Sequence, residues 1–146
     1  MRAVLVVHVV LAIFLIGPLV AAANQLPRAL RAGSGDGVRL LSRTVTVYGW
    51  ASLLVAVVGF GLVRDRFSFS DGWLIASIVL FVVASVLVLG LLVPMLRGAS
   101  GASGATGASG PTGDTGALAP RAAAVAGIAS LCYVAIAVLM AWKPGG

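Results

Sequence analysis

Glutamate is absent from this 146-residue sequence, and histidine and cysteine each occur once. The four acidic residues are aspartates that lie in polar stretches between long apolar segments: Asp36, Asp65, Asp71 and Asp114. With one cysteine, Cys132, no internal disulfide can form. The sequence also lacks an HExxH motif, a GxSxG motif and any carboxylate inside an apolar segment. The common metalloprotease, serine-hydrolase and proton-coupled transport sites are therefore not predicted, and we expect a protein that is not an enzyme.

Charge is also scarce, since charged residues form 10% of the chain and hydrophobic residues 60%. In soluble domains, roughly a quarter of the residues are charged and roughly half are hydrophobic. The net charge of +6 comes from cations spread along the chain, without an aromatic-interleaved basic face. We therefore expect no nucleic acid, and phospholipid headgroups of a bilayer as the partner of these cations. Nine of the ten cations are arginine, which, with the many Ala, Val, Gly and Leu residues, indicates a high-GC bacterial gene.

Four apolar segments dominate what is present, and none contains Asp, Glu, Lys or Arg. Each is long enough to cross a bilayer, for which roughly 20 residues are needed. The polar stretches between them are too short to form a core of their own. The sequence predicts one all-α integral membrane domain over residues 1–146, an up-down four-helix bundle. Its predicted transmembrane helices are Ala3–Ala23, Thr44–Val63, Gly72–Leu96 and Ala122–Trp142.

The first segment also resembles a secretory signal, because Arg2 precedes an apolar run that ends in Ala21–Ala23. Signal cores span about 7–15 residues, and this run of about 20 is longer. We favour an uncleaved first transmembrane helix, with a cleaved signal as the alternative. The expected location is the bacterial inner (plasma) membrane.

The distribution of cations predicts an orientation. Four spans place both termini on one side, and the side with more loop arginines is expected to be cytoplasmic. Residues 24–43 form the predicted first loop, in which Pro27 opens a short amphipathic turn. The arginines of this loop are expected to contact anionic lipid headgroups: Arg28, Arg31, Arg39 and Arg43. With Arg97 and Arg121 on the same side, we expect both termini to be extracytoplasmic.

Small residues recur at helical spacing in the second and fourth segments. Such residues let transmembrane helices approach closely, so we expect these two helices to pack most tightly. The residues are Ser52, Ala56 and Gly59 in one helix and Ala122, Ala126 and Ser130 in the other. In the first helix, Gly17 and Pro18 predict a bend, because proline removes a backbone hydrogen bond. Pro94 has the same effect near the end of the third helix.

His8 is the only residue within a span that titrates near neutral pH. An ionisable group inside a membrane is a functional hypothesis by default. An up-down bundle places His8 at the depth of Gly59 and Ser77. One interpretation is a neutral histidine bonded to Ser77, a backbone carbonyl or water. The alternative is a haem or metal ligand completed by Met140 or by His8 of a second copy. A third, Ser77 with His8 as a rhomboid-like catalytic pair, is weaker.

Residues 98–118 have glycine at every third position, GASGASGATGASGPTGDTGAL. Collagen has this period, but seven triplets with one proline between helices are poor material for a triple helix. We predict a flexible linker.

Several of these residues carry a resemblance to a known group. His8 early in the first helix, Gly17-Pro18, Tyr48-Gly49 and Asp71-Gly72-Trp73-Leu74 resemble small four-helix predicted integral membrane proteins of unknown function from high-GC bacteria. That group is similar in helix layout to copper-resistance D-like membrane proteins. The resemblance implies metal or haem binding by early-helix histidines, and only His8 matches such a position. The triplet loop departs from the group's pattern.

The sequence therefore favours a non-enzymatic membrane protein without a cofactor, acting by helix packing as an accessory subunit of a larger complex or as a homo-oligomer. The first alternative is a haem- or metal-binding protein that uses His8. The second is a small channel or carrier formed by oligomerisation around the Pro18 bend.

Overall fold

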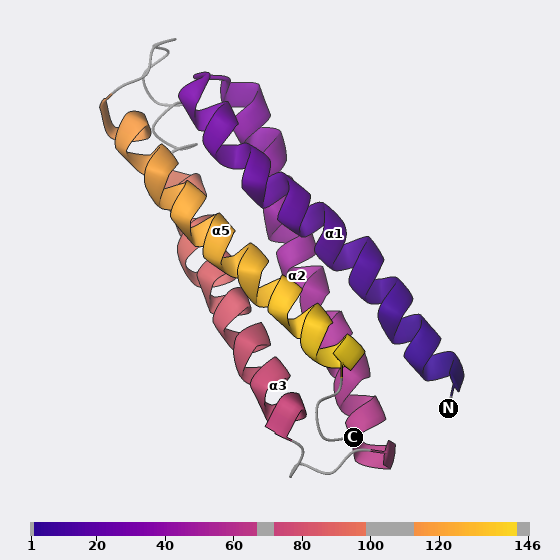
Figure 1. Ribbon diagram of the computed structural model, residues 1–146. Helices are drawn as coiled ribbons and strands as arrows, with labels where there is room; N and C mark the ends of the chain where they lie inside the picture. Colours follow the sequence, from indigo (N-terminus) through magenta and orange to yellow (C-terminus); the bar gives the residue numbers. More distant parts are fainter. Residues whose placement is uncertain (1, 67–71, 99–112, 143–146) are drawn as a thin grey trace.

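The computed structural model describes residues 2–66, 72–98 and 113–142, and over these residues the fold is helical, with no strand (Figure 1). The four spans run alternately up and down, and both termini lie at the same end of the bundle. Each span is long and apolar enough to cross a membrane. The predicted all-α, four-helix, up-down membrane fold is confirmed. Its elements are α1 (Arg2–Arg31), α2 (Gly35–Arg66), α3 (Gly72–Ser85), the π-helix η1 (Val86–Leu92) and α5 (Gly113–Trp142), with residues 93–98 helical after η1.

The first two helices are longer than predicted. α1 has 30 residues and α2 has 32, or about 45 Å or more at 1.5 Å per residue, against a hydrocarbon core of roughly 30 Å. The prediction of a loop over residues 24–43 is wrong for most of that range. Leu26 and Leu30 are buried, because they continue the helical stripe that begins at Leu19 and so hold this polar stretch in the bundle.

α1 ends in a tight glycine turn. Gly33 has a φ of 63°, and its N–H donates to the Leu30 carbonyl while the Ser34 N–H donates to the Ala29 carbonyl. This pair of bonds is the Schellman arrangement, which satisfies carbonyls at the helix end. Ser34 then caps α2, since its hydroxyl accepts a hydrogen bond of 3.2 Å from the Gly37 N–H. The two helices therefore form a compact antiparallel hairpin.

The turn gives a first prediction. Gly33→Ala is expected to lower the free energy of unfolding by about 1–2 kcal/mol, because a Cβ is disfavoured in the left-handed region. Gly35→Ala is the matched control, since an added Cβ there meets nothing within 4 Å and φ is not positive. Equilibrium unfolding in mixed detergent micelles measures both. Equal effects of the two substitutions would contradict the role given to the Gly33 conformation.

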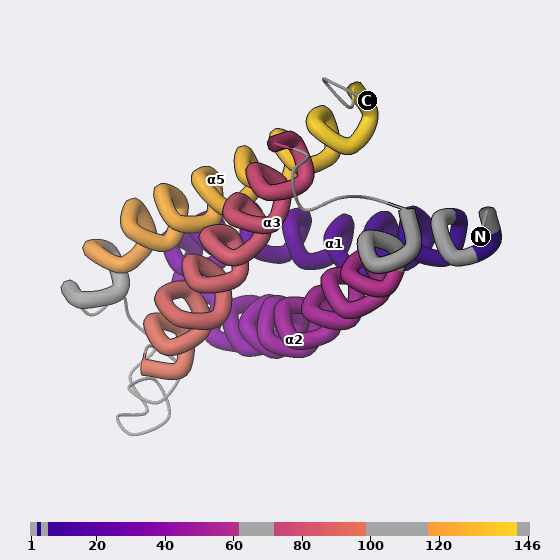
Figure 2. Tube along the Cα trace, turned by 90° about the horizontal axis from the view of Figure 1, so that it is seen from below, coloured from indigo at the N-terminus to yellow at the C-terminus, as the bar shows by residue number. Residues whose placement is uncertain are grey.

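The helices pack as two pairs, α1 with α2 and α3 with α5, and α1 also packs against α5. α2 reaches the second pair mainly through η1. Figure 2 shows this arrangement from below. The prediction that the second and fourth helices, α2 and α5, pack most tightly is wrong. α1 lies between them because the long α1–α2 hairpin and the Asn24–Ser130 contact described below place it against both.

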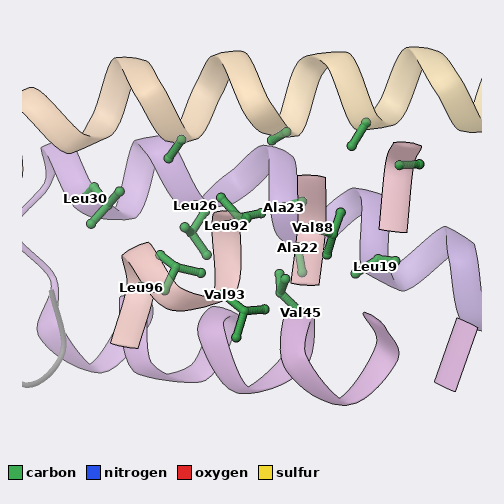
Figure 3. Close-up of a cluster of buried hydrophobic side chains, with 14 of the residues drawn as sticks. Leu19, Ala22, Ala23, Leu26, Leu30, Val45, Val88, Leu92, Val93 and Leu96 are labelled. Atoms are coloured by element: carbon green, nitrogen blue, oxygen red, sulfur yellow. The ribbon is translucent and has the colours of Figure 1, made fainter. Parts of the chain in front are cut away.

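The main hydrophobic core occupies the half of the bundle that contains the α1–α2 turn (Figure 3). It combines the second half of α1, the first half of α2, the end of α3 with η1 and the turn that follows, and the first two thirds of α5. Its fully enclosed large side chains are Leu19, Leu26, Leu92, Leu96, Val45 and Val88. At the other end, the smaller cluster of Trp73 and Leu74 belongs to α3 alone. The core is therefore uneven along the bundle axis.

The π-helix precedes Pro94. In η1 the Val93 N–H donates to the Val88 carbonyl, five residues back. A proline at position 94 has no N–H to donate and its ring crowds the carbonyl four residues earlier, at Gly90. A wider π turn is one way to absorb that conflict. The predicted disturbance by Pro94 thus takes the form of a π-helix, whereas α1 stays continuous through Pro18 and Pro27.

Large apolar side chains are exposed on the outer surface of each of the four spans. Exposed residues include Phe14 (68%), Leu131 (69%) and Trp142 (80%). In water such a surface would drive aggregation, and in a bilayer it faces acyl chains.

Candidate functional site

His8 packs against α2 at Gly59. A Cβ added to Gly59 would lie 3.0 Å from Cε1 and 3.5 Å from Nδ1 of the imidazole. That separation is tighter than nearly all real Cβ contacts, so the imidazole ring can lie here because Gly59 has no side chain. The predicted match in depth between His8 and Gly59 is confirmed.

The ring nitrogens of His8 are only partly engaged. The side chain is half-buried and the backbone of Val55 interacts with it, yet Nδ1 is buried and makes no hydrogen bond to any described residue. The hydroxyl of Ser77, a predicted partner, donates instead to the Trp73 carbonyl within α3 at 2.8 Å. His8 therefore keeps one nitrogen that can bond to a ligand.

A second polar site lies in the middle of the bundle. Tyr133 of α5 is buried, and its hydroxyl interacts with Ser52 of α2 and Ser85 of α3. Within the described part of the chain, neither the Tyr133 hydroxyl nor the Ser85 hydroxyl makes a hydrogen bond, although both oxygen atoms are enclosed. The Ser52 hydroxyl donates to the Gly49 carbonyl at 2.7 Å. The sequence had identified only Ser52, as a packing residue.

The aromatic ring of Tyr133 packs against α3, and this contact fixes the position of its hydroxyl. The ring packs edge-on against Phe81 of α3, with centroids 6.4 Å apart and an interplanar angle of 72°. This is a favourable aromatic geometry. It aims the hydroxyl at the junction of α3 and η1, because Ser85 is the last residue before the π-helix.

Asn24 joins α1 to α5. Its Nδ2 donates to the Ser130 hydroxyl at 2.9 Å and to the Val20 carbonyl at 2.9 Å, while Ser130 donates to the Ala126 carbonyl at 2.7 Å. Hydrogen bonds between transmembrane helices contribute on average about 0.6 kcal/mol. Ser130 is thus at a helix interface, but the partner helix is α1.

The other predicted packing residues also lie at interfaces. Ala122 and Ala126 are buried in the core, Ser52 is 1% exposed and Ala56 is half-buried. Gly17, predicted at a bend, is exposed, and an added Cβ there meets nothing within 4 Å.

The predicted lipid-contacting arginines lie at the end of the bundle that contains the α1–α2 turn. Arg28, Arg31, Arg39 and Arg43 are exposed there. Two more exposed arginines, Arg97 after η1 and Arg121 near the start of α5, lie at the same end (Figure 1). We call these six residues the arginine collar. Residues 99–112 of the predicted linker lie outside the described part of the chain, and Gly113–Leu118 begin α5.

Comparison with known families decides the classification. Residues 2–144 match the family described as predicted integral membrane protein (DUF2269). The chain belongs to this family. No curated protein and no solved structure matches the chain. The family description states a membrane location and no activity, which agrees with the four spans of the fold.

In this family member, the side chains of the two polar sites can form hydrogen bonds or act as ligands. No group of three or more His, Cys, Asp or Glu that could hold a metal is present among the described residues. A metal or haem at His8 would therefore need its other ligands from a second copy or a partner, because the end of α5 that carries Met140 lies apart from the N-terminal end of α1 (Figures 1 and 2). The Tyr133 site offers neutral hydroxyls, which suit a small uncharged ligand.

Proposed function

We propose that the protein is a non-enzymatic membrane subunit that acts by packing against another membrane helix, either in a second copy of itself or in a larger complex. The observation that carries this proposal is the uneven core. Among the residues whose burial is described, the core shared by the four helices lies in the half near the arginine collar. In the other half, the first part of α1 leaves most of its apolar surface open for a partner.

Side-chain exposure defines the open surface. On α1, Val6, Ile13 and Phe14 are exposed by 57%, 64% and 68%. Small residues lie on the same surface. Gly17 is exposed on α1, and Ala137 and Ala141 are exposed near the end of α5. Figures 1 and 2 both show the N-terminal end of α1 and the C-terminal end of α5 apart from each other. Small exposed residues allow a partner helix to approach closely, and close contact drives association where lipid is as apolar as the side chains.

Cysteine cross-linking tests the proposed surface. In a Cys132→Ala background, Gly17→Cys and Ala137→Cys are expected to form disulfide-linked dimers in native membranes or to cross-link to a fixed partner. Val79→Cys, on an exposed position of α3, is the matched control and should stay monomeric. Mass spectrometry of the protein purified in mild detergent then distinguishes a second copy from another subunit. A monomer with no companion, and no cross-link at Gly17 or Ala137, would refute the proposal.

We place the protein in the bacterial inner membrane with the arginine collar on the cytoplasmic side and both termini outside. Six exposed arginines at one end support this orientation, because positive residues near helix ends remain in the cytoplasm. Their side chains would contact anionic headgroups, each contributing about 1 kcal/mol. Ser34→Cys in the Cys132→Ala background is expected to resist a membrane-impermeant thiol reagent in intact cells and to react after lysis. Labelling of intact cells would reverse the orientation.

A second candidate function is haem or metal binding by His8. The enclosed Nδ1 without a protein partner supports it, as does the resemblance to copper-resistance D-like proteins. The expected result is a Soret band or a stoichiometric metal in protein purified from its own membrane, lost in His8→Ala. A colourless, metal-free protein would eliminate this function and leave the packing proposal unaffected.

A further inference from the structure

The Tyr133 site gathers three hydroxyl groups from three helices in a region that lipid cannot reach. Tyr133 is only 7% exposed and Ser52 only 1%. The oxygen atoms of Tyr133 and Ser85 are enclosed and have no hydrogen-bond partner in the protein. Both serines lie close to the Tyr133 hydroxyl, but no hydrogen bond joins the Tyr133 or Ser85 hydroxyl to another described side chain or backbone group. The site therefore holds two unused donors close together.

The hydroxyls define what the ligand must be. Each hydroxyl can donate one hydrogen bond and accept two. Ser52 has already used its proton on the Gly49 carbonyl, so it can only accept. Tyr133 and Ser85 can both donate and accept. None of the described residues brings a charged side chain to the site, so the matching ligand is small, neutral, and able to donate and accept at once.

We propose that Ser52, Ser85 and Tyr133 bind a water molecule inside the membrane-spanning bundle. An enclosed hydroxyl without a partner is destabilising by about 1–3 kcal/mol, and two such groups lie close together. A buried water with 2–4 polar partners satisfies them together. It also links α2, α3 and α5 where α3 changes into η1, at a point where backbone geometry departs from the α-helix.

His8 and Ser52 belong to sites on one face of α2. Ser52, Val55 and Gly59 are spaced three and four residues apart, so they lie on one face of α2. His8, which is half-buried, packs on Gly59 and interacts with Val55 at the more open end of the bundle. His8 and the Tyr133 site therefore lie against the same face of α2, about two helical turns apart.

Water-edited solid-state NMR tests this site directly. The chain has two tyrosines, so a Tyr48→Phe protein labelled with ¹³C at the tyrosine Cζ reports on Tyr133 alone. We expect fast magnetisation transfer from water to Tyr133 in lipid bilayers, although its side chain is enclosed. The transfer should be lost in the Ser52→Ala, Ser85→Ala double variant and retained in Ser85→Thr, which keeps the hydroxyl.

Ser77→Ala is the matched control. Ser77 is also a buried serine of α3, but its hydroxyl is already bonded to the Trp73 carbonyl, so the Tyr133 signal should not change. Slow transfer in the parent protein would overturn the proposal. So would fast transfer that survives in the double variant, or that is lost equally in Ser77→Ala, because the water would then not depend on these hydroxyls. The outcome is independent of any partner subunit.

Discussion

Leu26→Ala is expected to lower the free energy of unfolding by roughly 0.5–2.5 kcal/mol. Leu26 is fully enclosed in the core, and Leu→Ala in soluble cores costs about 2–5 kcal/mol. Part of that cost, roughly 0.8 kcal/mol for each carbon removed, reflects transfer from water. In a membrane the side chain is transferred from lipid, which is as apolar as leucine, and not from water. The transfer contribution is therefore absent, and only the contribution of the cavity remains. Unfolding with increasing SDS in mixed micelles, followed by circular dichroism, measures the change.

Leu131→Ala is the matched control for this experiment. Leu131 lies in α5 and is 69% exposed, so its truncation leaves no cavity and should change stability by less than about 0.5 kcal/mol. If the two substitutions had equal effects, the core in Figure 3 would not be what holds the helices together.

The four spans could be predicted because each is an unbroken apolar run with a length set by the bilayer. The true helix ends could not be read from hydropathy, since residues 24–43 are polar enough to resemble a loop. A signal was present in the spacing of side chains. On α2 the buried positions Val38, Ser42, Val45, Gly49 and Ser52 recur every three or four residues, and this period crosses the boundary at which the apolar run begins.

The two polar sites differ in how well they could be predicted from the sequence. Depth in an up-down bundle identified Gly59 and Ser77 as possible neighbours of His8, and the structure places the ring against Gly59. The Tyr133 site has no such signal, because Ser52, Ser85 and Tyr133 are far apart in the sequence and each is an ordinary residue in an apolar helix. Their meeting depends on the rotation of α2, α3 and α5, which hydropathy does not specify. The partner of α2 was mispredicted for the same reason.

Gly49→Leu is expected to have the largest effect of a single substitution, lowering the unfolding free energy by about 3 kcal/mol. A Cβ at Gly49 would lie 2.8 Å from Cδ2 of Leu89 and 3.5 Å from Cγ1 of Val88. This is where α2 meets η1, the main link between α2 and the α3–α5 pair. Overpacking of this kind typically costs 1–3 kcal/mol, and a leucine adds more atoms than the interface can take without separating. Gly61→Leu, where an added Cβ meets nothing within 4 Å, should be nearly neutral.

A second substitution distinguishes overpacking from a simple loss of helix flexibility. The clashing atom belongs to the end of a side chain, so Leu89→Ala removes it and should restore much of the stability lost in Gly49→Ala. The coupling free energy in this double-mutant cycle is expected to be about 1 kcal/mol or more, in the range seen for contacting residues. If the two substitutions were additive, Gly49 and Leu89 would not be in contact in the membrane. The junction of α2 with η1 would then lie elsewhere, and Ser52, less than one turn from Gly49, would no longer face Tyr133.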